Sequence, residues 1–181
     1  MNLYIKEVEV IMVPDAYYKS IFDINYDNLK KHNIKNLFLD VDNTLVPYTE
    51  DLVDKKTITF INKLKKDFNV VIVSNSMSKR VLRIAKDLDV KGYYTSMKPL
   101  KKTYKKILKE YNINESIFIG DQFMTDVLGA KRCKFKVILV DRMLNVEPMV
   151  TKFWRFFENI IIGDLSKKNK FNKYNYFDNI E

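Results

Sequence analysis

Short apolar runs alternate with amphipathic segments along most of this chain. The apolar runs are rich in β-branched residues and too short for helices; they span residues 36–41, 69–76, 91–96, 116–121 and 135–141. Between them, apolar residues recur every three or four positions, as in a helix with one buried face, over residues 55–67, 78–90, 98–113 and 122–133. The pattern predicts strands and helices in strict alternation.

This alternation predicts an α/β fold. Short links between strand and helix favour a parallel sheet covered by helices on both faces, and continuous apolar strands suit a sheet buried on both sides. We therefore expect a three-layer, Rossmann-like, doubly wound sheet. At 181 residues the chain fits one such domain.

The pattern also divides the chain into segments. Residues 1–36 are predicted to be a lead-in segment, in which the spacing of Tyr18, Ile21 and Phe22 after Pro14 favours a helix. The core is predicted over residues 37–145. An amphipathic helix is predicted over residues 146–165, and a polar, loosely ordered tail over residues 166–181.

Composition excludes several classes of protein. The apolar runs are shorter than the roughly 20 residues that cross a bilayer, and no signal peptide is evident, so we expect a cytoplasmic protein. A single cysteine, Cys133, excludes an internal disulfide, and with the single His32 it excludes a zinc site of the usual ligands. The net charge of +9 favours phosphates, anionic lipids or nucleic acid, although lysine and asparagine are abundant throughout the chain.

Polar residues follow four of the predicted strands. In a doubly wound sheet, ligands bind beyond the carboxyl ends of the strands, so these residues are expected to converge. They are Asp40, Asp42, Thr44, Ser74, Asn75, Lys98, Asp121 and Asp126. Each has a simpler interpretation alone, such as a turn residue, a helix cap or a solvated charge. Their common position at one edge favours a site.

The residue types predict phosphoryl transfer. Asp40 can attack phosphorus as a nucleophile, and Asp42 can protonate the leaving oxygen and then activate water. Mg²⁺ would relieve the repulsion between these carboxylates, with Asp121 as a further oxygen ligand. The residues predicted to hold the phosphoryl group are Thr44, Ser74, Asn75 and Lys98. Lys98 is also predicted to neutralise charge in catalysis. The candidate metal ligands are Asp40, Asp42, Asp121 and Asp126.

Four motifs resemble those of the haloacid dehalogenase superfamily. They are FLDVDNTL, VIVSNS, KP and IGDQFMTDVLGAKR, within residues 35–140. The finer pattern resembles subclass IIIA and its bacterial YqeG-type group, which is similar to the mitochondrial phosphatidylglycerophosphatase. The resemblance implies that Asp40 is the nucleophile and Asp42 the acid and base. It also implies that the Asp42 main-chain carbonyl joins Asp40 and Asp121 at Mg²⁺, with Asp126 as an additional acid.

The resemblance implies a lipid substrate in phospholipid biosynthesis, phosphatidylglycerophosphate. The gaps between the motifs leave no room for a cap domain, which predicts an open site suited to a phosphate on something large. A capless enzyme could also close its site by forming an oligomer, and the oligomeric state is left open. A phosphatase for soluble or nucleic-acid phosphates, or a basic protein that binds RNA or ribosomes, is the alternative.

The predicted C-terminal helix carries aromatic and basic residues. Over residues 150–161, apolar side chains recur at helical spacing beside Lys152 and Arg155. Such a helix can lie in a membrane interface, which would place the protein peripherally at the inner membrane face. The alternative is that the helix packs on the core or on a second copy of the chain.

Overall fold

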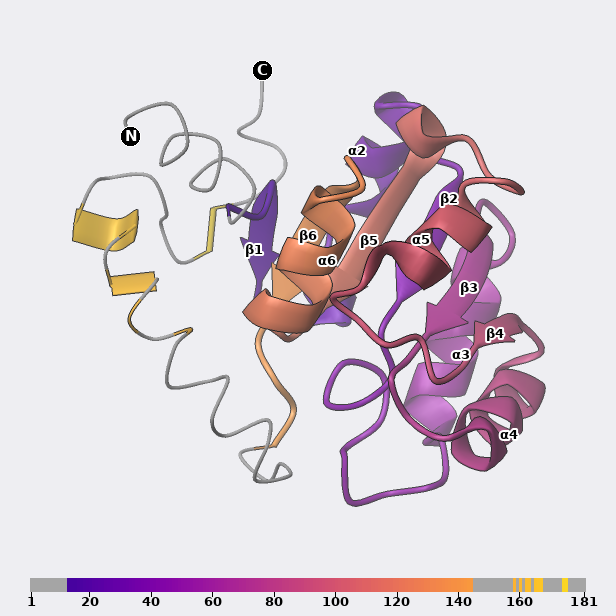
Figure 1. Ribbon diagram of the computed structural model, residues 1–181. Coiled ribbons are helices and arrows are strands. Elements are labelled where there is room, and N and C mark those ends of the chain that lie inside the picture. The colour runs from indigo at the N-terminus through magenta and orange to yellow at the C-terminus, as the bar shows by residue number, and fades with distance from the viewer. Residues whose placement is uncertain are drawn as a thin grey trace.

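The fold is built on one six-stranded parallel sheet (Figure 1). The computed structural model describes residues 13–144 together with Glu158, Ile160, Ile162, Gly163, Leu165–Lys167, Tyr174 and Asn175. The strand order is β1-β6-β5-β2-β3-β4, with every neighbouring pair parallel. The strands are β1 (Ala16–Tyr18), β2 (Asn36–Leu39), β3 (Asn69–Val73), β4 (Lys91–Tyr93), β5 (Ser116–Gly120) and β6 (Lys136–Val140).

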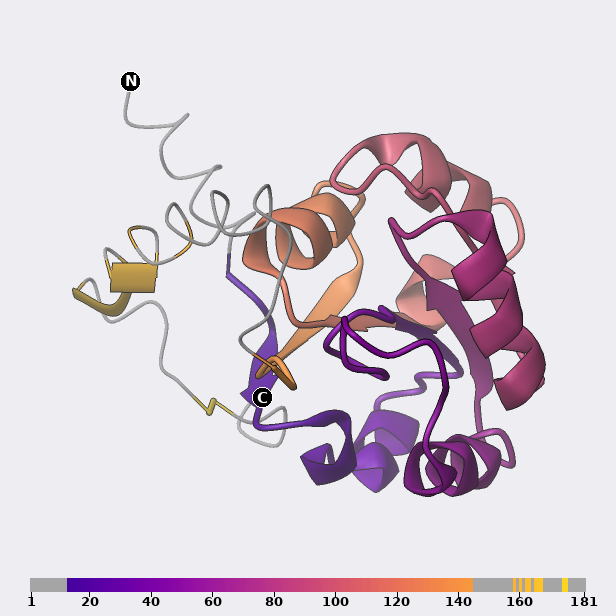
Figure 2. The same ribbon diagram turned by 90° about the horizontal axis from the view of Figure 1, so that it is seen from below.

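Helices cover both faces of this sheet. They are η1 (Ile21–Asp23), α2 (Tyr26–Lys31), α3 (Lys55–Leu64), α4 (Ser78–Leu88), α5 (Lys101–Ile107), η2 (Ile113–Glu115), η3 (Phe123–Val127) and α6 (Leu128–Lys131). Helices α2 and α3 lie on one face, and α5 and α6 lie on the other (Figure 2). The predicted three-layer α/β fold is confirmed. From β2 to β6, each connection carries only these helices and loops, with no inserted cap domain.

Alternate residues of each strand enter different hydrophobic clusters. In β2, Leu37 and Leu39 pack with α3 and α4 residues, whereas Phe38 packs with Tyr104 of α5 on the opposite face. All three side chains are fully buried. This is the two-residue period of a strand. Because both faces are covered, the strands are apolar beyond their first residues.

The lead-in segment contains a strand where its spacing favoured a helix. Ala16–Tyr18 forms β1, which pairs with β6, and the residues that follow form the short η1 and then α2. The Asp15 amide donates to the Val137 carbonyl at 2.8 Å, which continues the ladder. The helical interpretation was therefore wrong, because pairing with a distant strand outweighs local spacing.

The predicted C-terminal helix and tail lie mostly outside the described residues, and so do most of residues 150–161. Of the described ones, Glu158 is buried and accepts from the Met124 amide at 3.0 Å. Leu165 is buried in the cluster of α5 and α6. These contacts attach Glu158 and Leu165 to the core. Within the described part of the chain, no helix has the length and apolar character to span a membrane.

Candidate active site

The predicted site residues lie at the carboxyl edge of the sheet. Asp40 follows β2, Ser74 follows β3, Lys98 lies in the loop after β4, and Asp121 follows β5. The Asp40 amide donates to the Ile119 carbonyl at 2.9 Å, so the β2–β5 ladder fixes the start of the loop that carries both aspartates. Because all strands are parallel, one edge of the fold collects these loops.

Lys98 is the centre of a buried cluster of charges. Its Nζ lies 2.5 Å from Oδ1 of Asp40 and 2.6 Å from Oδ1 of Asp126. It also donates to the Val73 carbonyl at 3.0 Å, at the end of β3. The side chain of Lys98 is only 2% exposed. Three oxygens from three different elements therefore fix the ammonium group, as a buried charge requires.

Asp126 is held in place by the turn that follows β5. It lies in η3, a π-helical turn, and its Oδ2 accepts from the Gln122 amide at 3.0 Å. A Cβ atom added to Gly120 would lie 2.5 Å from Cγ of Asp126. The glycine is therefore required by the close approach of the carboxylate to the strand end. With one oxygen on Lys98 and the other on the main chain, Asp126 positions Lys98.

Asp40, Asp121 and Asp126 form a group that could hold a metal ion. Ligand oxygens of these three buried carboxylates lie within 4.8 Å of one another. Three carboxylates against the single ammonium of Lys98 leave an excess of two negative charges. Hard oxygen donors with this excess fit a divalent cation such as Mg²⁺.

The electrostatics of Asp40 and Lys98 agree with this interpretation. Burial raises the pKa of Asp40, and the charges of Asp126, Asp121 and Asp42 raise it further against the opposing effect of Lys98. Burial alone would lower the pKa of Lys98, but the charges of Asp126 and Asp40 outweigh it and raise that pKa. Both pKa shifts favour the protonated forms and so reduce the negative charge of the cluster, which a bound cation would also do.

Asp42 accepts hydrogen bonds from two residues, Arg80 and Ser76, that were not among the predicted site residues. Arg80 donates to Asp42 Oδ1 through Nη2 at 2.9 Å and through Nε at 3.2 Å. Ser76 donates its hydroxyl to Asp42 Oδ2 at 2.5 Å. Arg80 also contacts the loop after Asp42, through the Pro47 carbonyl and a 2.8 Å ion pair with Asp51. Arg80 thereby fixes both the carboxylate and its loop.

A signal for Arg80 was present in the sequence. It lies in the first turn of α4, where the helix dipole disfavours a positive side chain. A basic residue there needs a compensating anion, and the nearest candidates by topology are the carboxylates at the carboxyl edge.

Ser74, Asn75 and Thr44 lie in the loops of this edge. The fully buried Ser74 hydroxyl lies 3.3 Å from Asp42 Oδ2 and accepts from the Ser76 amide at 3.0 Å. The Asn75 side chain bonds both main-chain groups of Lys98, accepting from its amide at 2.7 Å and donating to its carbonyl at 3.1 Å. Asn75 thus positions Lys98. Thr44 is buried, and its hydroxyl has no hydrogen-bond partner within the described residues.

Comparison with known proteins assigns this arrangement to a family. The model of the haloacid dehalogenase-like hydrolases matches residues 12–134. The chain belongs to the haloacid dehalogenase-like hydrolases. It is 31% identical over 159 residues to "Probable phosphatase YqeG" of Bacillus subtilis (strain 168), covering 86% of this chain and 92% of that protein. This haloacid dehalogenase-like hydrolase is therefore a phosphatase of the YqeG type, as its motifs predicted.

Solved structures share the fold at low sequence identity. The proposed hydrolase YfnB of Bacillus subtilis, bound to magnesium, matches with a TM-score of 0.52 and 12% identity over 65% of this chain and 91% of that one. A proposed 3-deoxy-D-manno-octulosonate 8-phosphate phosphatase of Vibrio cholerae matches with a TM-score of 0.50 and 16% identity, over 83% and 94%. Both place this haloacid dehalogenase-like hydrolase in the same fold.

Proposed function

We propose that this phosphatase is magnesium-dependent, works through an aspartyl-phosphate on Asp40, and removes the terminal phosphate of phosphatidylglycerophosphate. The observation that carries the mechanism is the buried cluster in which Lys98 contacts Asp40 at 2.5 Å and Asp126 at 2.6 Å beside Asp121. A structural role alone gives no reason to bury three carboxylates around one lysine, because each buried charge costs free energy.

The metal would be held by the carboxylates of Asp40 and Asp121 and by the Asp42 carbonyl. When bound, Mg²⁺ supplies positive charge that stabilises phosphoryl oxygens and keeps Asp40 ionised. Asp126 already uses both oxygens on Lys98 and the Gln122 amide, so we assign it a contact through water. Magnesium is the ion bound to YfnB, which shares the fold, and this agrees with the choice of metal.

The proposed reaction has two displacements. In the first, a carboxylate oxygen of Asp40 forms a bond to phosphorus while the ester oxygen leaves and takes a proton from Asp42. In the second, Asp42 takes a proton from water, whose oxygen attacks phosphorus and breaks the bond to Asp40, releasing inorganic phosphate. Ser74 and Thr44 would donate to phosphoryl oxygens, and Lys98 would offset charge on Asp40. Arg80 and Ser76 position the Asp42 carboxylate.

The lipid substrate is supported by the YqeG-type motifs and by the absence of a cap. Between β2 and β6 the structure has no inserted domain that could enclose a small substrate. A site without a cap can receive a phosphate that projects from a bilayer. The alternatives, soluble or nucleic-acid phosphates, use the same chemistry and are distinguished by experiment.

The first experiment measures phosphate release from phosphatidylglycerophosphate in mixed micelles, with Mg²⁺ and with EDTA. Soluble phosphomonoesters are run in parallel, together with the Asp40→Asn variant. We expect fast lipid turnover only with Mg²⁺ and none with Asp40→Asn. Faster turnover of soluble esters would overturn the substrate and leave the mechanism standing. Unchanged activity of Asp40→Asn would overturn the mechanism.

A further inference from the structure

Large apolar side chains that are exposed collect at the carboxyl edge of the sheet. Among the described residues, all of them except Leu82 and Ile160 lie in loops that leave the carboxyl end of a strand. This apolar rim consists of Tyr48, Leu52, Met77, Tyr94, Met97, Leu100, Met143 and Leu144. The loops at the opposite edge, over residues 32–35, 65–68, 89–90, 108–115 and 131–135, carry none of them.

The loops that carry the apolar rim are also the loops that build the active site. Met97 precedes Lys98, and Met77 follows the serines that contact Asp42. Asn43, next to Asp42, binds two rim residues: its side chain accepts from the Tyr48 amide at 3.1 Å, and its carbonyl accepts from the Met143 amide at 2.9 Å. The rim is therefore fixed to the catalytic loops.

Several side chains of the apolar rim are mostly exposed to solvent. Met77 is 79% exposed and Leu52 is 67% exposed. Single exposed apolar residues are ordinary, but their concentration at one edge, with none at the other, marks an interaction surface. Because the loops that carry the active-site residues lie at the same edge, a partner bound to the rim would face the active site.

Lysines accompany the apolar rim. Lys79 lies two residues after Met77, and Lys101 and Lys102 follow Leu100; all three are exposed. Of the acids in these loops, Asp51 pairs with Arg80, and the exposed Asp54 accepts from the Thr57 amide and keeps its charge. Glu50 is an exposed acid beside them. With a net charge of +9, this mixture of apolar and basic side chains complements an anionic bilayer surface.

We propose that the apolar rim docks the enzyme on an anionic lipid bilayer, with Leu52, Met77 and Leu100 entering the interface. Docking in this orientation turns Asp40 toward the membrane, where a phosphorylated headgroup can reach it without leaving the bilayer. This docking surface rests on the proposed lipid phosphatase activity, and it adds how the enzyme would reach a lipid substrate. It uses described loops and does not require residues 150–161.

The test measures binding without turnover. Full-length protein is sedimented with vesicles of equal parts phosphatidylcholine and phosphatidylglycerol, and with vesicles of phosphatidylcholine alone. A variant with Leu52→Ser, Met77→Ser and Leu100→Ser is compared with a control, Leu82→Ser, which removes an apolar side chain that is 50% exposed outside the rim. Partial insertion of three side chains predicts about tenfold weaker binding of the triple variant to anionic vesicles.

Each outcome decides the proposal. We expect wild type and Leu82→Ser to bind anionic vesicles alike, and the triple variant to keep hydrolysis of a soluble phosphomonoester within about twofold of wild type. Equal binding by all three proteins, or no binding by wild type, would overturn it. A wild-type dimer that becomes a monomer in the triple variant would also overturn it, because the rim would then cover a second copy. Since these vesicles contain no substrate, failure of the proposed lipid activity is recognised separately, in the micelle assay.

Discussion

Two lysines of this protein each bridge two aspartates, and only one of them belongs to the active site. Lys30 lies 2.7 Å from Asp27 and 3.0 Å from Asp67, whereas Lys98 lies 2.5 Å from Asp40 and 2.6 Å from Asp126. The side chain of Lys30 is 41% exposed, and that of Lys98 is 2% exposed. The contacts are similar in length, so the surroundings of the two lysines account for the difference.

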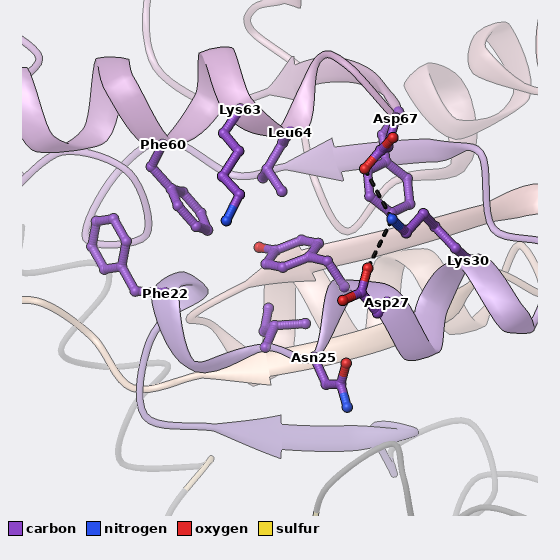
Figure 3. Close-up of a pocket in the computed structure, with 11 residues that line it drawn as sticks. Phe22, Asn25, Asp27, Lys30, Phe60, Lys63, Leu64 and Asp67 are labelled. Atoms are coloured by element: carbon purple, nitrogen blue, oxygen red, sulfur yellow. Dashed lines mark hydrogen bonds and ion pairs between the residues drawn. The ribbon is translucent and has the colours of Figure 1, made fainter.

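Lys30 and its two aspartates lie at the border of a cavity (Figure 3). A cavity of about 420 Å³ between α2 and α3 is lined by aromatic rings, including Phe22 and Phe60, with Lys30 and its aspartates at its border. Hydrogen bonds to Asp27 and Asp67 raise the pKa of Lys30, but water screens these charges. A cavity beside a lysine and two aspartates therefore does not by itself identify a catalytic site. The buried, mutually repelling carboxylates do.

The largest difference between the two lysines is expected when Lys98 is replaced. Lys98→Met keeps the volume but leaves the carboxylates of Asp40 and Asp126 without their cation, which predicts at least about a thousandfold loss of kcat. Loss of one partner of a buried pair also predicts about 3–5 kcal/mol lower stability in EDTA. Steady-state kinetics and chemical unfolding measure the two effects. The matched variant Lys30→Met should retain wild-type kinetics; a similar loss of kcat there would mean that burial is not what separates the two lysines.

Replacement of Arg80 tests whether Asp42 depends on its partners. Arg80→Gln removes two donors to Asp42 and the link to Asp51, so we expect kcat to fall about 10- to 100-fold with a smaller change in KM. Arg80→Lys should recover part of the loss, because it keeps a charge but not the two-nitrogen contact. Arg83→Gln, on the exposed side of the same helix, is the control. Equal kinetics for Arg80→Gln and Arg83→Gln would contradict the positioning role.

The sequence was sufficient to predict the core strands and the convergence of Asp40, Lys98 and Asp121. Both follow from local periodicity and from the rule that parallel strands end at one edge. β1 could not be predicted this way, because Ala16–Tyr18 becomes a strand only by pairing with β6, which lies more than a hundred residues further along the chain.

Side-chain partners were also beyond the sequence pattern. Asn75 was predicted to hold phosphate through the main-chain amides around it, and the pattern did not reveal that its side chain bonds the main chain of Lys98. The place of Arg80 in the first turn of α4 was a signal, but the chain has many other basic residues, and its partner Asp42 could not be read from the pattern. Rotamers and loop paths decide such contacts, and neither is encoded in spacing. The roles assigned to the site residues stay predictions until the variants are measured.

A methyl group added at Gly120 is expected to disturb the same charged cluster, with a smaller effect on kcat. In Gly120→Ala the new methyl would press on Cγ of Asp126 at 2.5 Å and displace the carboxylate from Lys98. We expect about 1–3 kcal/mol lower stability and roughly tenfold lower kcat. Gly163→Ala is the matched control, since nothing lies within 4 Å of its added Cβ. Wild-type kinetics in Gly120→Ala would show that Asp126 tolerates displacement.

The smallest effect on catalysis is expected in the aromatic cavity. Phe60 packs against Phe22 at a ring distance of 4.8 Å and against Tyr26 at 5.7 Å. Phe60→Leu removes these ring contacts, so we expect about 1–2 kcal/mol lower stability from thermal unfolding, with kcat and KM unchanged. Gly120→Ala is expected to lower stability by a similar amount. The two variants therefore differ mainly in whether they disturb the charged cluster of the active site. A loss of kcat in Phe60→Leu equal to that in Gly120→Ala would mean that stability, and not the position of Asp126, limits the activity of both.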